Sequence, residues 1–485
     1  MVAVATVFVT FAYLQSRGAL QQISVQLKGS PIAWGLLASH LLAMAVFAGL
    51  SSVLFGSQIL GLKADSVAVF WLLAGTVAIV LAAFAFVPPR RWLQLVRTTS
   101  RAWAYALSAV VLVYPAGRLG WTLWKPATAL TFDFVQVLLH PFIPHLIADR
   151  ATSRIGSESF SVIIAPQCSG LEGAGLMLVF GVVFLWIFRH ESRFPQALLL
   201  LPAGVGILWV LNAVRIAVLI LIGDAGAESV AAGGFHSQAG WIAFNVVAVA
   251  FCVAARRVPW MTTTPPERLT RVVPAENPVA PYLVPFLVIL AAGMISRAVS
   301  GSFEWLYPLR FFAAAAALWF FRHRYAKLDW RFGWFAVLVG CGVFVLWLAL
   351  DRISGTHADS GIAAGLASWP GWARIAWLIF RTLAAVVTVP IAEELAFRGF
   401  LLRRLISSDF EAVGWRSWTY FSLLGSSVAF GLMHGNRWLA GTVAGVLYAW
   451  TLLRRGRIGD AVAAHATSNA LLAGWVLFRG AWYLW

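Results

Sequence analysis

Long apolar runs, separated by short polar or basic segments, occupy most of this chain. A helix needs about 20 residues to cross a hydrocarbon core of about 30 Å, and most runs reach or approach that length. Such unbroken runs exclude an outer-membrane barrel, whose strands alternate apolar and polar residues. The pattern predicts an all-α polytopic membrane protein with about 13 transmembrane helices in two helical-bundle modules. The expected spans are 32–54, 66–87, 102–117, 171–188, 197–222, 239–255, 279–296, 308–321, 332–350, 373–402, 417–433, 438–453 and 461–478.

Two segments depart from this pattern. Residues 2–14 form either a further short span or an interfacial helix, and they lack the basic start and cleavage site of a signal peptide. Residues 256–281 are rich in Thr, Pro and charge, which is typical of a linker between domains. We place the boundary near 265–275, so that residues 1–265 form one module and residues 266–485 the other.

Composition and charge agree with this class. The chain is 61% hydrophobic and 11% charged, whereas soluble domains are about 25% charged. Its net charge of +17 comes from basic clusters between the apolar runs, which indicates cytoplasmic loops rather than a nucleic-acid surface. These clusters alternate correctly with the spans only if 118–168 lies wholly on the outer face, as an amphipathic, partly interfacial segment. The clusters are Arg90/Arg91/Arg97/Arg101, Arg189/Arg193, Arg256/Arg257, Arg322/Arg324/Lys327, Arg403/Arg404 and Arg454/Arg455/Arg457.

Three reactive side chains of the first half are expected at the outer end of the bundle. Cys168 precedes the span that begins at 171, Arg215 lies two-thirds along 197–222, and His236 falls in the loop 223–238. A helix N-terminus and a nearby cation lower the pKa of a thiol, a histidine can move its proton, and a guanidinium can stabilise an oxyanion. The set suits thioester-forming proteolysis or transpeptidation.

A cysteine in an apolar segment is otherwise an inert small hydrophobe. This is how we interpret Cys252 and Cys341. The three cysteines are odd in number and far apart, so they indicate no disulfide framework.

Acidic residues mark the second half. Glu394 and Arg398 are four residues apart, so they share a helix face and are expected to form a structural ion pair. Glu393 is rotated by about 100° from Glu394 and is expected to point elsewhere. It is therefore free to act as a base.

Histidines complete the second set. Glu393 and His434 would deprotonate a water, while His465 and Asn469, four residues apart, would stabilise the oxyanion. Counting from the basic loops places Glu393 near mid-membrane and His465 in the inner third, but His434 towards the outer side. Zinc ligation by Glu393, His434 and His465 is possible chemistry but is not favoured, because no His-Glu-x-x-His motif is present. A buried network that only fastens helices is the structural alternative.

The first set resembles the exosortase/archaeosortase family. The resemblance rests on Gln167-Cys168-Ser169-Gly170, Asn212-x-x-Arg215 and Phe235-His236 and covers about residues 30–256. It implies Cys168 as nucleophile, Arg215 as stabiliser and His236 as acid/base, with Gly170 and Asn212 supporting. It also implies exported protein substrates whose C-terminal sorting tail has a short motif, one membrane span and a basic cluster.

The second set resembles the CAAX-processing endopeptidase and bacteriocin-processing (CPBP, Abi) family. Glu-Glu-x-x-x-Arg at 393–398, Phe-x-x-x-His at 430–434 and His-x-x-x-Asn at 465–469 carry this resemblance across about 280–480. It implies that Glu393, His434, His465 and Asn469 are catalytic, with Glu394 and Arg398 supporting and no cofactor.

Together the halves resemble the fused exosortase E/protease variant. This implies a multi-pass enzyme of a bacterial inner membrane with Cys168 facing the periplasm. It would cut the sorting tails of exported proteins at one site and peptide bonds in or beside the membrane at the other. Recognition grooves are expected in 118–165 and 351–372. Two alternatives remain: one module is catalytically silent and acts in substrate binding or immunity, or the chain is a transporter.

Overall fold

The computed structural model describes residues 18, 32–55, 63–100, 104, 126–165, 168, 170–263, 277–354 and 361–485. Segment 2–14, the expected boundary near 265–275 and, except for residue 104, the expected span 102–117 lie outside these residues. By its contacts the chain divides into residues 1–117 with 419–421, and residues 118–418 with 422–485. The two units are described separately.

The described part of the first unit is a helical hairpin followed by an amphipathic helix. Helices α2 and α3 are antiparallel, because His40 Nδ1 donates to Ala78 O (2.8 Å) while Trp71 donates to Ser51 (2.8 Å). Both helices are apolar on all sides, as expected of spans. The bounds are α2 Trp34–Phe55, α3 Lys63–Phe86 and α4 Pro89–Thr98.

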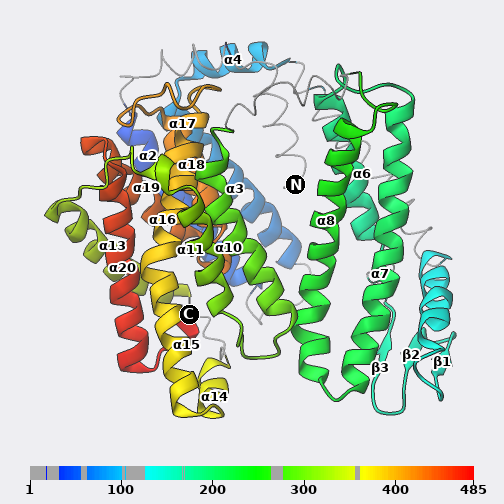
Figure 1. Ribbon diagram of the computed structural model, residues 1–485. Helices are drawn as coiled ribbons and strands as arrows, with labels where there is room; N and C mark the ends of the chain where they lie inside the picture. The colour runs from blue at the N-terminus through cyan, green and yellow to red at the C-terminus, as the bar shows by residue number, and fades with distance from the viewer. Residues whose placement is uncertain are drawn as a thin grey trace. The chain divides into compact units, whose positions relative to one another are not determined.

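The second unit begins with a helix, Pro126–Leu139, and a three-stranded antiparallel sheet. The sheet lies beside one end of α7 (Figure 1). Ser157 and Ser159 both donate to Asp224, the last residue of α7, at 2.5 and 2.6 Å. The strands are β1 Ile147–Asp149, β2 Arg154–Gly156 and β3 Ser161–Ile163, in the order β1-β2-β3.

An amphipathic segment was expected here, and the strands were not predicted. They form because Ile155, Ile164 and Phe160 pack with the helix Pro126–Leu139 and α7 in one apolar core. Gly223 of α7 allows this, since any Cβ there would collide with the Phe160 ring. Tertiary packing therefore decided the conformation of a segment whose own pattern was ambiguous.

Three helices, α6, α7 and α8, form the bundle of the first module. Methionine and phenylalanine side chains fill the space between them, and Gly181 and Gly204 bring the helix backbones close to those side chains. The bounds are α6 Leu171–Ile187, η2 Gln196–Leu199, α7 Leu200–Asp224, η3 Val230–Phe235 and α8 His236–Arg257.

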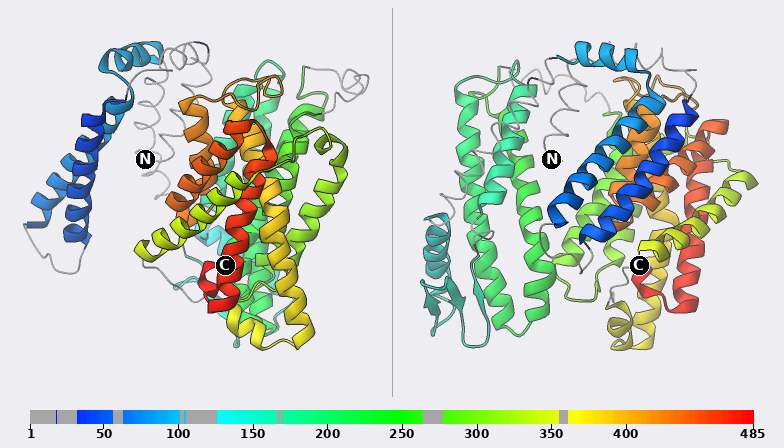
Figure 2. Two further views of the ribbon diagram at one scale, coloured as in Figure 1. Left: turned by 90° about the vertical axis from the view of Figure 1, so that its left-hand side faces the viewer. Right: turned by 180° about the vertical axis from the view of Figure 1, so that it is seen from behind.

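The second module packs α13, α19 and α20 against a long broken helix, Gly371–Arg404, and against α10. Figure 2 shows this arrangement from two further sides. The bounds are α10 Ala280–Ala298, α11 Pro308–Phe320, α12 Arg322–Tyr325, α13 Trp334–Ser354, α14 Ile362–Ala367, α15 Gly371–Leu383, η4 Ala384–Thr388, α16 Val389–Glu394, η5 Leu395–Leu401, α17 Leu402–Arg404, α18 Tyr420–Leu432, η6 Gly435–Arg437, α19 Trp438–Arg455, α20 Ile458–Arg479 and η7 Trp482–Leu484.

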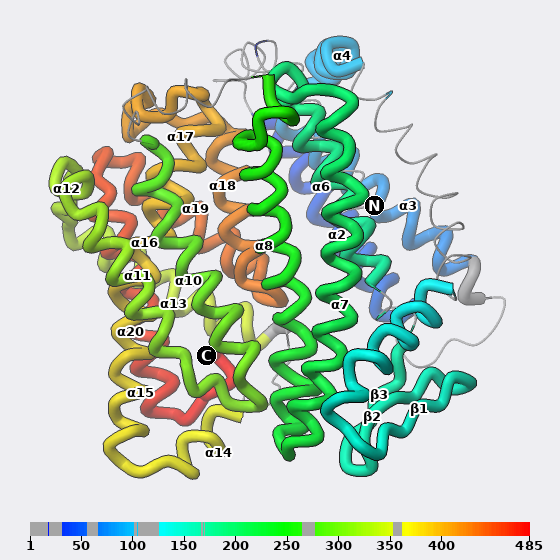
Figure 3. The backbone as a smooth tube through the Cα atoms, turned by 45° about the vertical axis from the view of Figure 1, so that its right-hand side comes forward, coloured from blue at the N-terminus to red at the C-terminus, as the bar shows by residue number. Residues whose placement is uncertain are grey.

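Helix α8 of the first module packs against the second module. It lies between α7 and α10 and contacts each of them (Figure 3). The preceding η3 also approaches α10 closely at Gly234, where any Cβ would collide with the main-chain oxygens of Arg297, in the last turn of α10, and of Ser300, just after it. The absent side chain lets two helix backbones touch.

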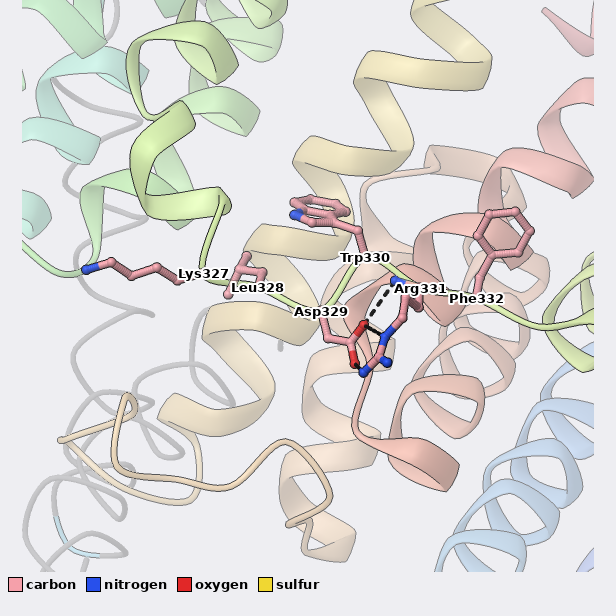
Figure 4. A pocket seen from close by; sticks show the side chains of 6 residues that line it. All are labelled: Lys327, Leu328, Asp329, Trp330, Arg331 and Phe332. Carbon is pink, nitrogen blue, oxygen red and sulfur yellow. Dashed lines mark hydrogen bonds and ion pairs between the residues drawn. The ribbon is translucent and has the colours of Figure 1, made fainter.

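A charged loop joins α12 to α13. Arg331 donates to Asp329 at 2.9 and 2.7 Å (Figure 4). Arg457 pairs with the same carboxylate at 3.4 Å. The hydrogen bond from Arg331 holds the pKa of Asp329 at about 2. The loop remains charged at any physiological pH, which keeps this end of the module polar.

The prediction of an all-α polytopic membrane protein is confirmed. In the described residues, eight helices are long and apolar enough to cross a membrane, and four shorter apolar helices accompany them. All the expected spans except 102–117 coincide with described helices.

Candidate active sites

Cys168 lies at the N-terminal end of α6. Gly170, with φ of +85°, turns the chain into the helix. Asn212 of α7 donates to the main-chain oxygen of Cys168 at 2.8 Å, and a Cβ at Gly170 would lie 3.1 Å from the same amide nitrogen. The two residues predicted to support the cysteine therefore fix its turn.

His236 lines a cavity of about 220 Å³ together with Cys168. The prediction that His236 lies in a loop 223–238 is wrong. The chain is helical from Glu228 onward, and His236 is the first residue of α8 after the π-helix η3. The loop was expected because 223–238 lies between two apolar spans, but this segment is helical and packs against the end of α10 at Gly234.

Arg215 lines the adjoining cavity, about 350 Å³ in volume, with Gly170 and Asn212. Its guanidinium lies against Gly240 of α8, where a Cβ would come within 2.7 Å of Nη1. Its Nε is buried and makes no hydrogen bond to any described residue. Arg215 interacts electrostatically with Cys168 and with His236. The structure thus groups the three predicted residues, with Cys168 and His236 in one cavity and Arg215 beside it.

Glu172 is a charged group that the sequence reasoning missed. It lies in the first turn of α6, lines the same cavity as Arg215, and interacts with that guanidinium. A carboxylate in the first turn of an otherwise apolar span was the available signal.

The two glutamates lie in a long helix that contains two π-helical segments. α16, which contains Glu393 and Glu394, is flanked by the π-helices η4 and η5. Glu394 pairs with Arg398 at 3.1 Å, as predicted, and also accepts from His465 Nδ1 at 3.0 Å. The expectation that Glu393 points elsewhere is wrong, because its Oε2 lies 3.9 Å from His465 Nε2. Both carboxylates face one imidazole.

The charged groups of this cluster are buried, so each of them needs a partner inside the protein. The Glu394 and Arg398 side chains are 0% and 1% exposed, and that of Glu393 is 14% exposed. Arg398 also donates to Gly445 O at 2.9 Å and lies 4.3 Å from the Phe430 ring centre. Both Oε2 atoms of the glutamates are buried without a hydrogen bond to a described residue. Buried acceptors of this kind are suited to holding a water or a substrate group.

Aromatic rings hold His465 in place. The Tyr448 ring stacks on the imidazole with centres 4.7 Å apart and an angle of 15°. Ser468 donates to His465 O, so the Tyr448 hydroxyl donates to Ser468, at 2.5 Å. Tyr448 was not predicted, since nothing in its sequence context distinguishes it from a core residue.

His434 lies two residues beyond the end of α18 at Leu432. Its Nδ1 donates to Phe430 O at 2.9 Å, which leaves Nε2 as an acceptor. The turn after it is fixed by Arg437, which donates to the buried Asp351 at 2.7 Å. The Trp347 ring contacts the imidazole edge-on at 5.5 Å.

Counting from the basic loops separated His434 from its expected partners in depth, yet the structure brings these side chains to one cavity. His434, Glu393, His465 and Asn469 line one cavity of about 250 Å³. Gly431, which has no room for a side chain against α19, allows α18 and α19 to meet closely at this turn. Asn469 is oriented by donating to Ala385 O in η4 at 2.8 Å.

The donor set was compared with a zinc site. Within the residues that the structure describes, no three His, Cys, Asp or Glu side chains are arranged to hold a metal ion. Glu394 is committed to Arg398 and His465, and His434 Nδ1 to a main-chain oxygen. Zinc sites instead converge three or four ligands on one point.

Two family models match the chain. The transmembrane exosortase (EpsH) model matches residues 1–253, and the type II CAAX prenyl endopeptidase Rce1-like model matches residues 375–471. The first covers Cys168, Arg215 and His236, and the second covers Glu393, His434, His465 and Asn469. No curated protein and no solved structure matches the chain.

Stability measurements should distinguish the two glutamates. Glu394→Gln leaves Arg398 with no compensating carboxylate in a buried site, and removing one partner of a buried pair costs about 3–5 kcal/mol. Glu393→Gln removes a carboxylate whose Oε2 forms no hydrogen bond to a described residue and lies 3.9 Å from His465 Nε2, so we expect a change within about 1 kcal/mol. Thermal unfolding in lipid nanodiscs measures both. Equal destabilisation by the two substitutions would contradict the assignment of Glu394 as the structural partner.

Proposed function

Because the chain belongs to the transmembrane exosortase family and carries a second, Rce1-like protease domain, we propose that it is a membrane enzyme with two peptidase sites. The first site cuts the C-terminal sorting tail of exported proteins by cysteine catalysis. The second cuts peptide bonds in or beside the membrane with an activated water. The location we propose is a bacterial inner membrane, with Cys168 at the periplasmic side.

The proposal for the first site rests on the cavity that Cys168 shares with His236. His236 takes the thiol proton, and the thiolate attacks the scissile carbonyl. Arg215, with its buried and unpaired Nε, stabilises the oxyanion. His236 then protonates the leaving amine, and the tail departs. Water, or the amine of an acceptor, resolves the thioester to release the exported protein.

Strand β3 supports an extended peptide as the substrate. The cavity at Cys168 is lined by the consecutive residues Val162, Ile163 and Ile164. Neighbouring residues of a strand point to opposite faces, so a cavity that touches all three lies along the strand's edge. β2 occupies the other edge, which leaves this edge free to pair with a peptide.

The register of the sheet shows which groups this edge offers. Ser157 donates to Phe160 O and Ile164 donates to Ser153 O. Residues 160, 162 and 164 therefore bond to β2, and the N–H groups of Ser161 and Ile163 point away from it. A substrate strand would receive hydrogen bonds from these two groups.

The proposal for the second site rests on the convergence of Glu393, His434 and His465 on one cavity. Glu393 and His434 Nε2 are the acceptors available to hold and deprotonate a water. His465, when protonated, and Asn469 stabilise the tetrahedral oxyanion. Glu394 and Arg398 position His465 and balance charge. No step of this mechanism requires a metal.

The central test uses co-expression with an exported protein that bears a sorting tail. We expect Cys168→Ala to reduce tail cleavage at least about a hundredfold, because the nucleophile is lost. Cys252→Ala, which removes a thiol from the same module, should have no effect. Intact mass measures the cut. Equal cleavage by Cys168→Ala and wild type would contradict the exosortase site.

The second site has its own prediction. Glu393→Gln should abolish the further cut that the Rce1-like module makes and leave the Cys168 cut intact, because the base is lost without a change in packing. Glu411→Gln, at an exposed glutamate of the same module, is the matched control. A further cut that persists in Glu393→Gln would remove the support for this site.

The second site can also be tested with metal chelators. Treatment of the purified enzyme with EDTA or 1,10-phenanthroline should leave the rate of the second cut unchanged. Inhibition that Zn²⁺ reverses would show a metal mechanism instead.

The edge strand can be tested by a proline. Ile163→Pro removes one outward N–H, and a proline is tolerated at an edge where the N–H is not used by the sheet. We expect tail cleavage to fall about two- to tenfold, the value of one hydrogen bond. Ile163→Ala removes the side chain but keeps the N–H and should be faster than Ile163→Pro. Equal rates for the two variants, with equal thermal stability, would show that β3 does not bind the substrate backbone.

A further inference from the structure

A cavity of about 320 Å³ lies between the two modules. The first module contributes Gly233, Gly234 and Ser237, which flank His236 on both sides. The second contributes the segment from the end of α10 to α11, together with Arg381 and Trp485. Neither module alone encloses this space. It is held in register by the contact of Gly234 with the end of α10 and by that of Gly301 with Ser229.

This cavity borders the glutamate site. Arg381 and Trp485 line both the cavity between the modules and the one that contains Glu393. Arg381 is 7% exposed, lies 4.0 Å from the Tyr307 ring centre and donates to Trp485 O at 2.7 Å. Its Nε is buried and bonds to no group in the described chain. A guanidinium at a wall between two cavities can offer this N–H to an oxygen in either one.

The same cavity borders the cysteine module. Ser237 lines it and also lines the cavity of Arg215. The preceding residue, His236, lines the cavity of Cys168. The cavities therefore follow one another from Cys168, past the first turn of α8, to Glu393.

We propose that a peptide made at Cys168 passes through the cavity between the modules to the Glu393 site, with Arg381 binding a carboxylate or main-chain carbonyl oxygen on the way. This inference rests on the proposed function of both sites. It gives them a shared substrate and gives the Glu393 site an entrance at the end of the bundle where Cys168 lies.

Charge selects the group that is bound. Arg297 and Arg381 line the cavity, and its one carboxylate among the lining residues, Glu304, is already paired with Arg310 at 2.5 and 2.8 Å. The excess of positive charge favours carboxylate and carbonyl oxygens over an ammonium group. Hydrolysis of the Cys168 thioester by water releases the thiol and creates a carboxylate at the new end of the exported protein. The cut leaves the released tail with an amine at its new end, so the tail would be bound here through its main-chain carbonyls. Arg381 could therefore bind an oxygen of either product, the carboxylate of the exported protein or a carbonyl of the tail.

The test replaces Gly233, which lines the cavity between the modules, with larger side chains that would fill it. A Cβ at Gly233 would meet no atom within 4 Å, so Ala, Leu and Phe can replace it and project into free space. Gly206 of α7 has equally free surroundings and lines none of the four cavities, so Gly206→Phe is the matched control. A time course of intact masses follows both the exported protein and its tail.

We expect the Cys168 cut to proceed at the wild-type rate in every variant. The second cut should slow in the order Gly233→Ala, Gly233→Leu, Gly233→Phe, by at least about tenfold for Phe, with the singly cut species accumulating. Accumulation of the exported protein identifies the carboxylate as the source, and accumulation of the tail identifies the carbonyls. Gly206→Phe should match the wild type.

Other outcomes overturn the inference in distinguishable ways. Equal second-cut rates in Gly233→Phe and Gly206→Phe exclude the path and leave both sites standing. A loss of both cuts in Gly233→Phe but not in Gly233→Ala or Gly233→Leu, with lowered thermal stability, shows disruption of the α8 contact instead of blockage. If neither Cys168→Ala nor Glu393→Gln changes any fragment, the proposed function fails first.

Discussion

A carboxylate placed inside an apolar helical module must be compensated, and the second module is organised around that requirement. Glu394 is completely buried and bonds to Arg398 and His465. Arg398 needs further partners, which Gly445 O and the Phe430 ring supply. An isolated buried charge would cost several kcal/mol. Satisfying it ties the broken helix Gly371–Arg404 to α18, α19 and α20, the elements that carry the remaining site residues.

The cysteine site depends on the position of one side chain at the start of a helix, and it contains fewer charged groups than the glutamate site. Cys168, the proposed nucleophile, lies in a turn at the start of α6 that Gly170 and Asn212 fix. The cation of this site, Arg215, is kept from the thiol's own cavity but within electrostatic range. A sheet anchored on Asp224 covers the end of α7 and contributes a strand edge to the same cavity. The first site therefore combines a rigid bundle with a surface suited to extended chain.

Sequence pattern located the helices, and the structure brings together the residues that the motifs proposed for each candidate site; pattern failed where tertiary packing decided. Apolar length located the spans because lipid and protein interiors both exclude unpaired backbone groups. A rotation of about 100° separates Glu393 from Glu394 on α16, but both carboxylates reach His465 because its ring carries a nitrogen on each of two sides. His434 follows a different helix and still lines the cavity of Glu393, because Gly431 lets α18 and α19 meet closely. His236 was assigned to a loop because it lies between two expected spans, and the strands were missed because their core lies on other elements.

The backbone contact at Gly234 has a consequence for how such a protein can change. Residue 234 belongs to the exosortase module, yet the space it leaves empty is filled by main-chain atoms of the protease module. Main-chain atoms cannot be exchanged for smaller ones, so no substitution in α10 can make room for a larger residue at 234. A larger residue at position 234 could therefore not be compensated by a smaller side chain in the other module. The association of the two modules is constrained by shape as well as by the covalent linker.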